Sequence, residues 1–383
     1  MKIHIPFNKP CIVGSELIYV GQAVAGGHAS GDGPFTWRAQ NMMEEHFGAR
    51  RILLTTSCTA ALELAALLCD LGPGDEVILP SFTFVSTANA IVLRGATPVF
   101  VDIRSDTLNI DERLIEAAIT PRTRAIFPIH YAGVGCEMDE IMSIARRHNL
   151  LVVEDAAQGV FAKYKGRWLG TIGHMGCYSF HETKNFSCGE GGALAINDPA
   201  LEKRAEILRE KGTNRSQFMR GQVDKYTWVD IGSSYVLSDM LAAFLLGQLE
   251  NMEKITSRRE EIFKCYDSML APLVKCGLIR SPLIPQHCTP NYHMFYLLAA
   301  DLAERTALIE HLRQAGILAV FHYVPLHSSP FAKSLGLPQP DLPVTDDTSR
   351  RLLRLPMYYD LSDREVTEVT ETVLDFYNNR RTL

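Results

Sequence analysis

Lys184 stands in a part of the sequence that could turn a lysine amine into a nucleophile. It lies between the apolar and aromatic residues 178–180 and the glycine-rich turn 189–192, which leads into another apolar run. Most lysines are solvated surface charges. Loss of water around this amine would lower its pKa and favour the neutral form, which attacks carbonyl groups. Lys184 is therefore a candidate catalytic residue.

Two adjacent carboxylates, Glu154 and Asp155, end a strand-like apolar run that begins at residue 150. A carboxylate in this position loses hydration and stays ionised only beside a cation or good hydrogen-bond donors. Successive side chains of a strand point to opposite faces, so at most one of the two is expected to face a given ligand. These residues alone leave open whether Asp155 binds a ligand or caps the following turn.

A possible anion site occurs at residues 57–60, Ser-Cys-Thr-Ala, which open a helical segment directly after a strand-like run at 51–55. The start of a helix offers unpaired N–H groups and the positive end of the helix dipole, and both attract phosphate. Ser57 or Thr59 could equally be an ordinary helix cap. The segment is thus a candidate phosphate site with a structural alternative.

Taken in chain order, an anion site, a buried acid and a lysine match the needs of pyridoxal phosphate. This cofactor requires a phosphate cradle, a carboxylate for its pyridine nitrogen and an amine that forms a Schiff base. The sequence has no GxGxxG between a strand and a helix, no GxxxxGK[ST], no HExxH and no GxSxG. The pattern favours a pyridoxal phosphate enzyme over nicotinamide, P-loop, zinc-protease and hydrolase classes.

Several segments of the chain resemble the DegT/DnrJ/EryC1/StrS sugar aminotransferases, in matching order and over essentially the whole length: SCTAALELA, GDEVILPSFTFVSTANAI, VEDAAQG, SFHETKN and GEGG. The resemblance implies a homodimer with active sites at the interface. It also implies transfer of an amino group from L-glutamate to a 4-keto-6-deoxy sugar nucleotide.

Other functions remain open alternatives. A related aminotransferase could use a different nucleotide or form the opposite C4 stereochemistry, and a relative could dehydrate at C3. Family members that dehydrate resemble this chain with histidine at the position of Lys184, which disfavours that activity. A non-catalytic regulator that binds the cofactor and a ligand-free structural oligomer are the alternatives from other classes.

The resemblance also implies roles for individual residues. Lys184 would attach the cofactor through a Schiff base, and Asp155 would hold the proton on the pyridine nitrogen. The remaining implied contacts are Gln158 with the phenolic oxygen, Phe84 stacked on the ring, Thr59, Ala60 and Ser179 on the phosphate, and His322 with nearby Tyr323 beside the sugar nucleotide.

One motif departs from the family. Many members carry GYNYRMSD where this chain has GSSYVLSD at residues 232–239. The resemblance implies that the asparagine of this motif contacts phosphate across the dimer interface, and that asparagine is missing here. Ser234 stands in its place and is the candidate substitute.

The elements that must position these residues alternate between short apolar runs and helical segments, which predicts parallel strands joined by helices. Such a sheet is covered on both faces, so its strands read as continuous apolar runs. Together with the resemblance, this predicts an α/β fold of the type I pyridoxal-phosphate aminotransferases, with a mostly parallel central sheet. The expected strands are 51–55, 76–79, 97–101, 125–128 and 150–154, and the expected helices are 59–71, 84–94 and 137–148.

A smaller α+β domain is expected at the C-terminal end. Apolar residues recur at three- and four-residue steps from 238 to about 270, which predicts one long amphipathic helix. Beyond it we expect an apolar run at 293–299, a helix at 304–315 and a strand-like stretch at 317–324. The predicted division is a large cofactor-binding domain at residues 1–250 and a small domain at 251–383.

Composition excludes several other classes. The 383 residues include 38 Lys and Arg against 44 Asp and Glu, a net charge of −6, so nucleic acid is not an expected partner. Nine scattered cysteines without a CxxC pair predict neither disulfides nor a metal site. Pro6 and Pro10 interrupt the start, and no apolar run approaches the roughly 20 residues of a membrane span. A cytoplasmic protein without a membrane partner is expected.

Overall fold

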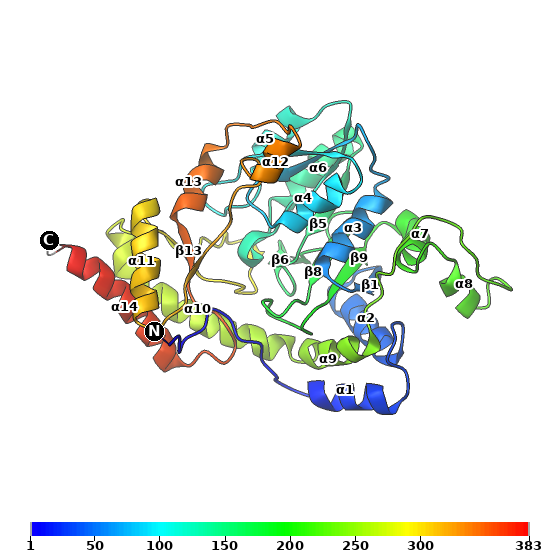
Figure 1. The fold of residues 1–383 in the computed structure, drawn as a ribbon, viewed down its shortest axis with the longest axis horizontal. Helices are drawn as coiled ribbons and strands as arrows, with labels where there is room; N and C mark the ends of the chain where they lie inside the picture. Colours follow the sequence, from blue (N-terminus) through cyan, green and yellow to red (C-terminus); the bar gives the residue numbers. More distant parts are fainter. Residues whose placement is uncertain (1, 382–383) are drawn as a thin grey trace.

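The computed structural model describes residues 2–381 and is built around a seven-stranded sheet (Figure 1). Its strand order is β1-β9-β8-β5-β4-β2-β3. In this sheet β9 pairs antiparallel with β1 and β8, whereas the other pairs are parallel. The predicted, mostly parallel sheet is confirmed. Its strands are β1 (Arg51–Thr55), β2 (Glu76–Pro80), β3 (Thr97–Val101), β4 (Thr123–Ile126), β5 (Leu151–Asp155), β8 (Met175–Ser179) and β9 (Gly192–Ile196).

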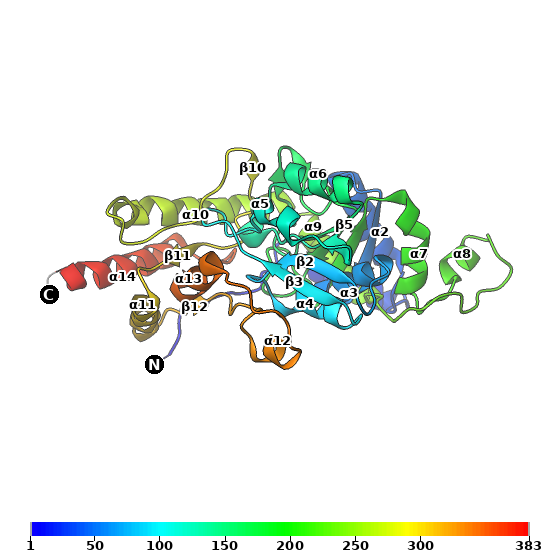
Figure 2. The same cartoon turned by 90° about the horizontal axis from the view of Figure 1, so that it is seen from above.

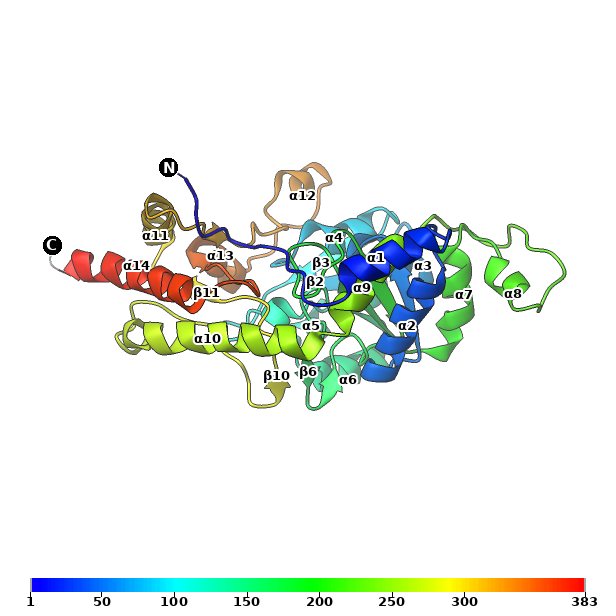
Figure 3. The ribbon, with the colours of Figure 1, turned by 90° about the horizontal axis from the view of Figure 1, so that it is seen from below.

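Helices cover both faces of this sheet (Figures 2 and 3). Within β1, Leu53 packs in the core with α3, whereas Ile52 and Leu54 pack in the core with α2 and α9. Burial on both faces explains why the strands read as continuous apolar runs. The helices on one face are α3 (Cys58–Leu68), α4 (Val85–Val92) and α7 (Pro199–Arg209), and those on the other are α2 (Pro34–Phe47), α6 (Met138–His148) and α9 (Asp239–Leu249), with α1 (Glu16–Ala25) packed on α9.

A second, smaller layer lies at the end of the molecule that carries both chain termini (Figures 1 and 2). Its antiparallel sheet has the order β11-β13-β12, and its own apolar core includes Ile5 from the start of the chain. Ile5 also forms a bridge with Ile317. The elements are β11 (Tyr296–Leu298), β12 (Val320–Phe321), β13 (Leu352–Arg354), α10 (Met252–Lys275), α11 (Leu302–Gln314), α13 (Pro343–Arg351) and α14 (Asp363–Arg381).

The predicted single helix from residue 238 to about 270 is wrong, because the structure has two helices there. α9 ends at Leu249 and α10 begins at Met252. Between them, the Asn251 side-chain amide donates a 2.8 Å hydrogen bond to the Gly247 carbonyl oxygen. Such local side-chain bonds compete with the helical pattern. The predicted domain boundary at residues 250/251 falls at this junction and stays a prediction.

Short elements complete the described chain. In residues 2–381, no helix is long and apolar enough to cross a membrane. The short elements are α5 (Glu112–Ile115), α8 (Arg215–Met219) and α12 (Pro330–Ser334), the 3₁₀ turns Glu116–Ala118 and Tyr131–Gly133, and a small sheet of β6 (Lys163–Tyr164), β7 (Arg167–Trp168) and β10 (Cys288–Thr289).

Candidate active site

A cavity of about 610 Å³ lies at the edge of the large sheet where its parallel strands end. β1, β2, β3, β4, β5 and β8 share one direction, so their carboxyl ends meet at this edge, where open α/β sheets bind ligands. The structure brings eight of the predicted site residues to the cavity wall: Thr59, Phe84, Asp155, Gln158, Ser179, Lys184, His322 and Tyr323.

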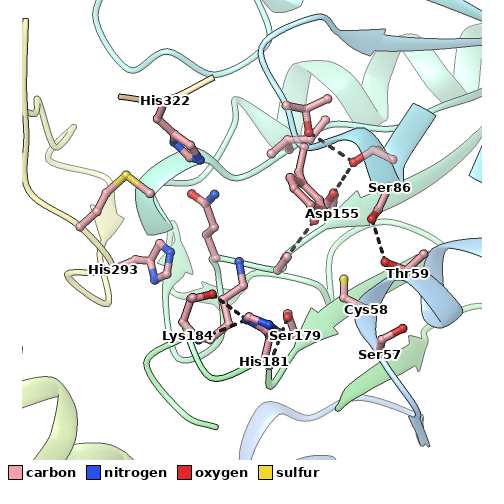
Figure 4. Close-up of a pocket in the computed structure, with 18 of the residues that line it drawn as sticks. Ser57, Cys58, Thr59, Ser86, Asp155, Ser179, His181, Lys184, His293 and His322 are labelled. Carbon is pink, nitrogen blue, oxygen red and sulfur yellow. Dashed lines mark hydrogen bonds between the residues drawn. The ribbon is translucent and has the colours of Figure 1, made fainter. Parts of the chain in front are cut away.

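Asp155 is the last residue of β5, and its carboxylate lines the cavity (Figure 4). Only 5% of the residue is exposed. Thr87 Oγ1 donates to Asp155 Oδ2 at 2.7 Å, and the Ala157 N–H donates to Oδ1 at 3.1 Å. The hydroxyl of Thr83 lies 3.2 Å from that of Thr87, which already gives its proton to Asp155. The protein therefore orients this carboxylate with hydrogen bonds from two directions.

Glu154 points to the opposite face of β5 and is fully buried. It accepts hydrogen bonds of 2.5–2.8 Å from the N–H groups of Gly170, Ile172 and Gly173. His130 Nε2 lies 2.8 Å from Oε2, the oxygen that also accepts from Gly170, whereas Ile172 and Gly173 donate to Oε1. The expectation that the two carboxylates face apart is met, and Glu154 holds a loop in place instead of facing the cavity.

The start of α3 forms the wall beside Asp155. Ser57 Oγ accepts a 3.1 Å hydrogen bond from the Ala60 N–H, so Ser57 caps the helix. Thr59 Oγ1 lies 2.7 Å from Ser86 Oγ, and both residues line the cavity. A Cβ atom at Gly192 would collide with the backbone of Ser57, so glycine lets β9 lie directly against this turn. Helix cap and candidate anion site thus coexist here.

Ala60 and Ser179 were both expected at the phosphate. Ser179 ends β8 and lines the cavity, where its Oγ accepts a long, 3.4 Å hydrogen bond from the His181 N–H. Ala60 is buried, and its N–H is occupied by Ser57. In the described structure Ala60 is not part of the cavity lining. The role of both residues in phosphate binding stays a prediction.

Lys184 projects into the cavity from the loop that follows β8 (Figure 4). Within residues 2–381, its Nζ makes no hydrogen bond or ion pair. Burial lowers the pKa of the Lys184 amine, and the positive charge of Arg354 acts in the same direction. Cys58 and Asp155 oppose this shift. A lowered pKa increases the share of the neutral, nucleophilic amine.

His322 and Tyr323 form the wall contributed by the smaller layer. His322 Nδ1 lies 3.0 Å from the Tyr131 hydroxyl, and burial lowers the pKa of His322 well below its usual value. Gln158 Nε2 donates to the Tyr323 hydroxyl at 3.0 Å, and Gln158 Oε1 accepts from the Ala132 N–H at 2.7 Å. Because its pKa is lowered, His322 is neutral near pH 7.

Phe84 precedes α4 and is 57% exposed at the mouth of the cavity. Its ring lies 6.4 Å from that of Tyr323, with the planes inclined by 44°. Exposure of a large aromatic ring beside a cavity leaves one face available to a flat ligand. The stacking role of Phe84 stays a prediction.

Sequence reasoning missed His293 and Arg354, which also line the cavity. His293 Nδ1 lies 2.8 Å from Asn185 Oδ1, while Asn185 Nδ2 donates to the Asn291 carbonyl oxygen. His293 must therefore carry its proton on Nδ1, because the facing oxygen only accepts. Both residues lie in apolar runs, and the single signal in the sequence was a polar residue interrupting such a run.

These groups fit pyridoxal phosphate. A capped helix start with nearby hydroxyls suits a phosphate, the oriented Asp155 carboxylate suits a protonated ring nitrogen, and an unpartnered Lys184 amine suits covalent attachment. Within residues 2–381, no group of three or more His, Cys, Asp or Glu residues could hold a metal ion. The site therefore offers the contacts of an organic phosphate cofactor.

Comparison with known proteins gives consistent matches over the whole chain. The sequence model of the DegT/DnrJ/EryC1/StrS aminotransferase family matches residues 10–374. The spore coat polysaccharide biosynthesis protein SpsC of Bacillus subtilis is 36% identical over 380 residues, which cover 97% of this chain and 96% of SpsC.

Solved structures give the same picture. The aminotransferase TlmJ from Streptoalloteichus hindustanus is 31% identical and superposes with a TM-score of 0.90 over 99% of this chain and 100% of TlmJ. The PMP-form of the putative sugar aminotransferase Spr1654 from Streptococcus pneumoniae is 29% identical, with a TM-score of 0.91 over 98% of this chain and 100% of Spr1654. The fold predicted from the sequence is confirmed.

Proposed function

The chain belongs to the DegT/DnrJ/EryC1/StrS aminotransferase family, and we propose that it moves an amino group from L-glutamate to C4 of dTDP-4-keto-6-deoxyglucose. The product is dTDP-4-amino-4,6-dideoxygalactose. Four segments support this substrate, because they are similar to the transaminase that forms this sugar: HYAGVGCEMD, HETKN, EKGTNRSQFMRGQVDKYTW and AVFHYVPLH. The relation of SpsC to polysaccharide biosynthesis is compatible with a sugar substrate.

The observation that carries the proposal is the meeting of Lys184 and Asp155 in one cavity. The Lys184 amine has no partner among the residues that the structure describes, and the Asp155 carboxylate is oriented by Thr87. The cofactor of this aminotransferase is pyridoxal 5′-phosphate, which accepts electrons from the donor's α-carbon and carries the amino group between substrates. The residues around it must then hold its charges and move protons.

Lys184 is the residue proposed to move the proton. With the cofactor bound, the free Nζ of Lys184 would take the proton from the α-carbon of glutamate and would deliver it to the cofactor carbon that carries the transferred nitrogen. Its lowered pKa keeps Nζ neutral and able to accept that proton. The same proton transfers in reverse order aminate the C4 ketone.

Asp155 is the residue proposed to hold a proton on the ring nitrogen. A positive ring withdraws electrons only while that proton stays in place, and an ionised carboxylate beside it secures the proton. Thr87 fixes the orientation of Oδ2 through its 2.7 Å hydrogen bond. Thr59 and Ser179 are proposed to bind the phosphate, while His322 and Tyr323 contact the sugar nucleotide.

We also propose a cytoplasmic homodimer with its active sites at the interface. The segment around α8 extends away from the rest of the molecule (Figures 1 and 3). It carries exposed large apolar side chains. Trp228 is 77% exposed and Met219 is 70% exposed. Exposed apolar groups of this size are typical of contact surfaces. The exposed Ser234 follows shortly after Trp228 in the chain, and it is the proposed substitute for the family asparagine.

The test combines trapping with product analysis. Borohydride reduction of the holoenzyme, followed by peptide mass mapping, is expected to place the cofactor on Lys184. NMR of the product from dTDP-4-keto-6-deoxyglucose and glutamate is expected to show an axial C4 amine. The matched control is Lys203→Arg, which changes an exposed lysine on α7.

Other outcomes would redirect the proposal. An equatorial amine overturns the galacto product, and absence of conversion overturns the substrate. A label on another lysine overturns the role of Lys184. Cofactor binding without any response to glutamate favours the regulator, whereas a protein that stays colourless with pyridoxal phosphate favours a structural role.

A further inference from the structure

Arg354 carries a partly buried positive charge that no carboxylate in the described structure neutralises. It is the last residue of β13, between the buried Leu353 and Leu355, and it lines the cavity. Its Nε atom is buried and has no hydrogen-bond partner in the described part of the chain. Within residues 2–381, no carboxylate forms an ion pair with it. This Nε–H group has lost water without gaining a hydrogen-bond partner in residues 2–381.

The surroundings hold Arg354 in place without satisfying its donors. The guanidinium carbon lies 4.6 Å from the ring centre of Phe7, a cation–π contact. Burial lowers the pKa of Arg354, and only Tyr131 and Tyr323 act in the opposite direction. Arginine nevertheless stays charged in proteins. Leaving a partly buried cation unpaired is unfavourable, so an anion that enters the cavity beside Arg354 would be stabilised there.

Arg354 lies on the reactive side of the cavity. Arg354 lines the same cavity as Lys184, His293 and His322, and its positive charge contributes to the lowered pKa of each of these groups. The nearby Asp155 carboxylate is already held by Thr87 and the backbone. The missing anion must therefore come from a molecule that enters the cavity and approaches Lys184.

We propose that Arg354 binds a carboxylate of the amino donor, an inference that rests on the proposed function. In an α-amino acid, one carbon separates the reacting nitrogen from the α-carboxylate. The diphosphate of a sugar nucleotide is attached across the sugar ring from C4 and must lie farther from Lys184. The planar fork of arginine matches a carboxylate with two parallel hydrogen bonds.

The test separates the two halves of the reaction in the holoenzyme. Arg354→Gln is expected to weaken the spectral response of the pyridoxal form to glutamate by about 10- to 100-fold, the range for hydrogen bonds to charged groups. Amination of the keto sugar nucleotide by the pyridoxamine form is expected to be unchanged. Calorimetry with glutarate, a dicarboxylate without an amine, is expected to show the same loss of binding.

Two further variants keep the test decisive. Arg354→Lys retains the charge but loses the fork, and we expect an intermediate affinity for glutarate. Arg313→Gln is the control, because this exposed arginine of α11 pairs with Glu310 outside the cavity. If Arg354→Gln does not fold, the affinity of Arg354→Lys for glutarate, compared with that of wild type, decides whether Arg354 binds a carboxylate.

Each contrary result has a separate meaning. Unchanged glutamate and glutarate binding in the Arg354 variants overturns the inference. Weakened use of the sugar nucleotide with normal glutamate binding also overturns it and assigns Arg354 to the diphosphate. A wild-type enzyme that does not respond to glutamate contradicts the proposed function instead.

Discussion

Glu154 and Asp155 are adjacent carboxylates on one strand, yet their surroundings differ in kind. Glu154 is closed in by three backbone N–H groups and His130, all supplied by the protein. Asp155 receives two hydrogen bonds and faces a cavity. Both are almost completely buried, so burial alone does not distinguish them. What distinguishes them is whether the protein satisfies the charge completely.

The comparison separates a stabilising carboxylate from a functional one. A carboxylate saturated by backbone donors fixes the loop that supplies them, whereas one that keeps an open side can bind a ligand. This division implies that substitution of Glu154 costs stability, whereas substitution of Asp155 costs activity.

Glu154→Gln should reduce stability more than activity. The amide cannot satisfy four donors, and breaking a buried ionic or hydrogen-bonded pair costs about 3–5 kcal/mol. Denaturant unfolding should therefore show a large loss in the free energy of unfolding. Glu371→Gln, on the exposed side of α14, is the control. A variant as stable as wild type would contradict the structural role of Glu154.

Asp155→Asn should show the opposite pattern. The side chain keeps its shape but loses its charge, so the rate of transamination should fall by about 10²- to 10³-fold, or roughly 2.7–4 kcal/mol in the activation free energy. Steady-state kinetics measures the fall, and denaturant unfolding should show little change in stability. Normal transamination by this variant would remove Asp155 from the mechanism.

Thr87→Val, on α4, tests whether the orientation of the Asp155 carboxylate contributes to the rate. It removes the 2.7 Å hydrogen bond to Asp155 but leaves the carboxylate charge intact. The expected loss in rate is about 10- to 100-fold, equivalent to roughly 1.5–3 kcal/mol. Thr87→Ser keeps the hydroxyl and should restore most of the rate. Equal rates in the valine and serine variants would show that orientation of Oδ2 is unimportant.

Lowering the pH should reduce the free energy of unfolding, because His322 is buried beside the cavity. Burial lowers the pKa of His322 in the folded protein, whereas the unfolded chain keeps the usual value of 6.5. Below pH 6.5 the unfolded chain therefore binds a proton that the folded protein does not. The contribution of His322 to the free energy of unfolding is fully present above pH 6.5. As the pH is lowered from 6.5, this contribution decreases by about 1.4 kcal/mol per pH unit.

The measurement is the pH dependence of unfolding in wild type and His322→Gln. Below pH 6.5, the free energy of unfolding of His322→Gln should depend less steeply on pH than that of wild type. The control His28→Gln, at an exposed position, should keep the wild-type dependence. An identical slope in wild type and His322→Gln would show that His322 does not cause the acid sensitivity.

The sequence predicted the large sheet well because its strands are continuous apolar runs joined by helical segments. It also predicted that Glu154 and Asp155 face apart, since strand geometry is local. Local patterns could not reveal that Asn251 interrupts the long helix through its bond to Gly247. Nor could local patterns show that Arg354 and Lys184 line the same cavity, because these residues come from different layers.

The contact between Phe7 and Arg354 ties the first residues of the chain to the chemistry. Asn8 also lines the cavity and donates a hydrogen bond to the Glu182 carbonyl oxygen at 3.0 Å. Lys9 and Pro10, which follow, are exposed. A protease that cut between Lys9 and Pro10 would break the covalent link between this wall of the cavity and the large sheet, while leaving every strand of that sheet intact. Loss of activity after such a cut would therefore occur without loss of the secondary structure of the large sheet.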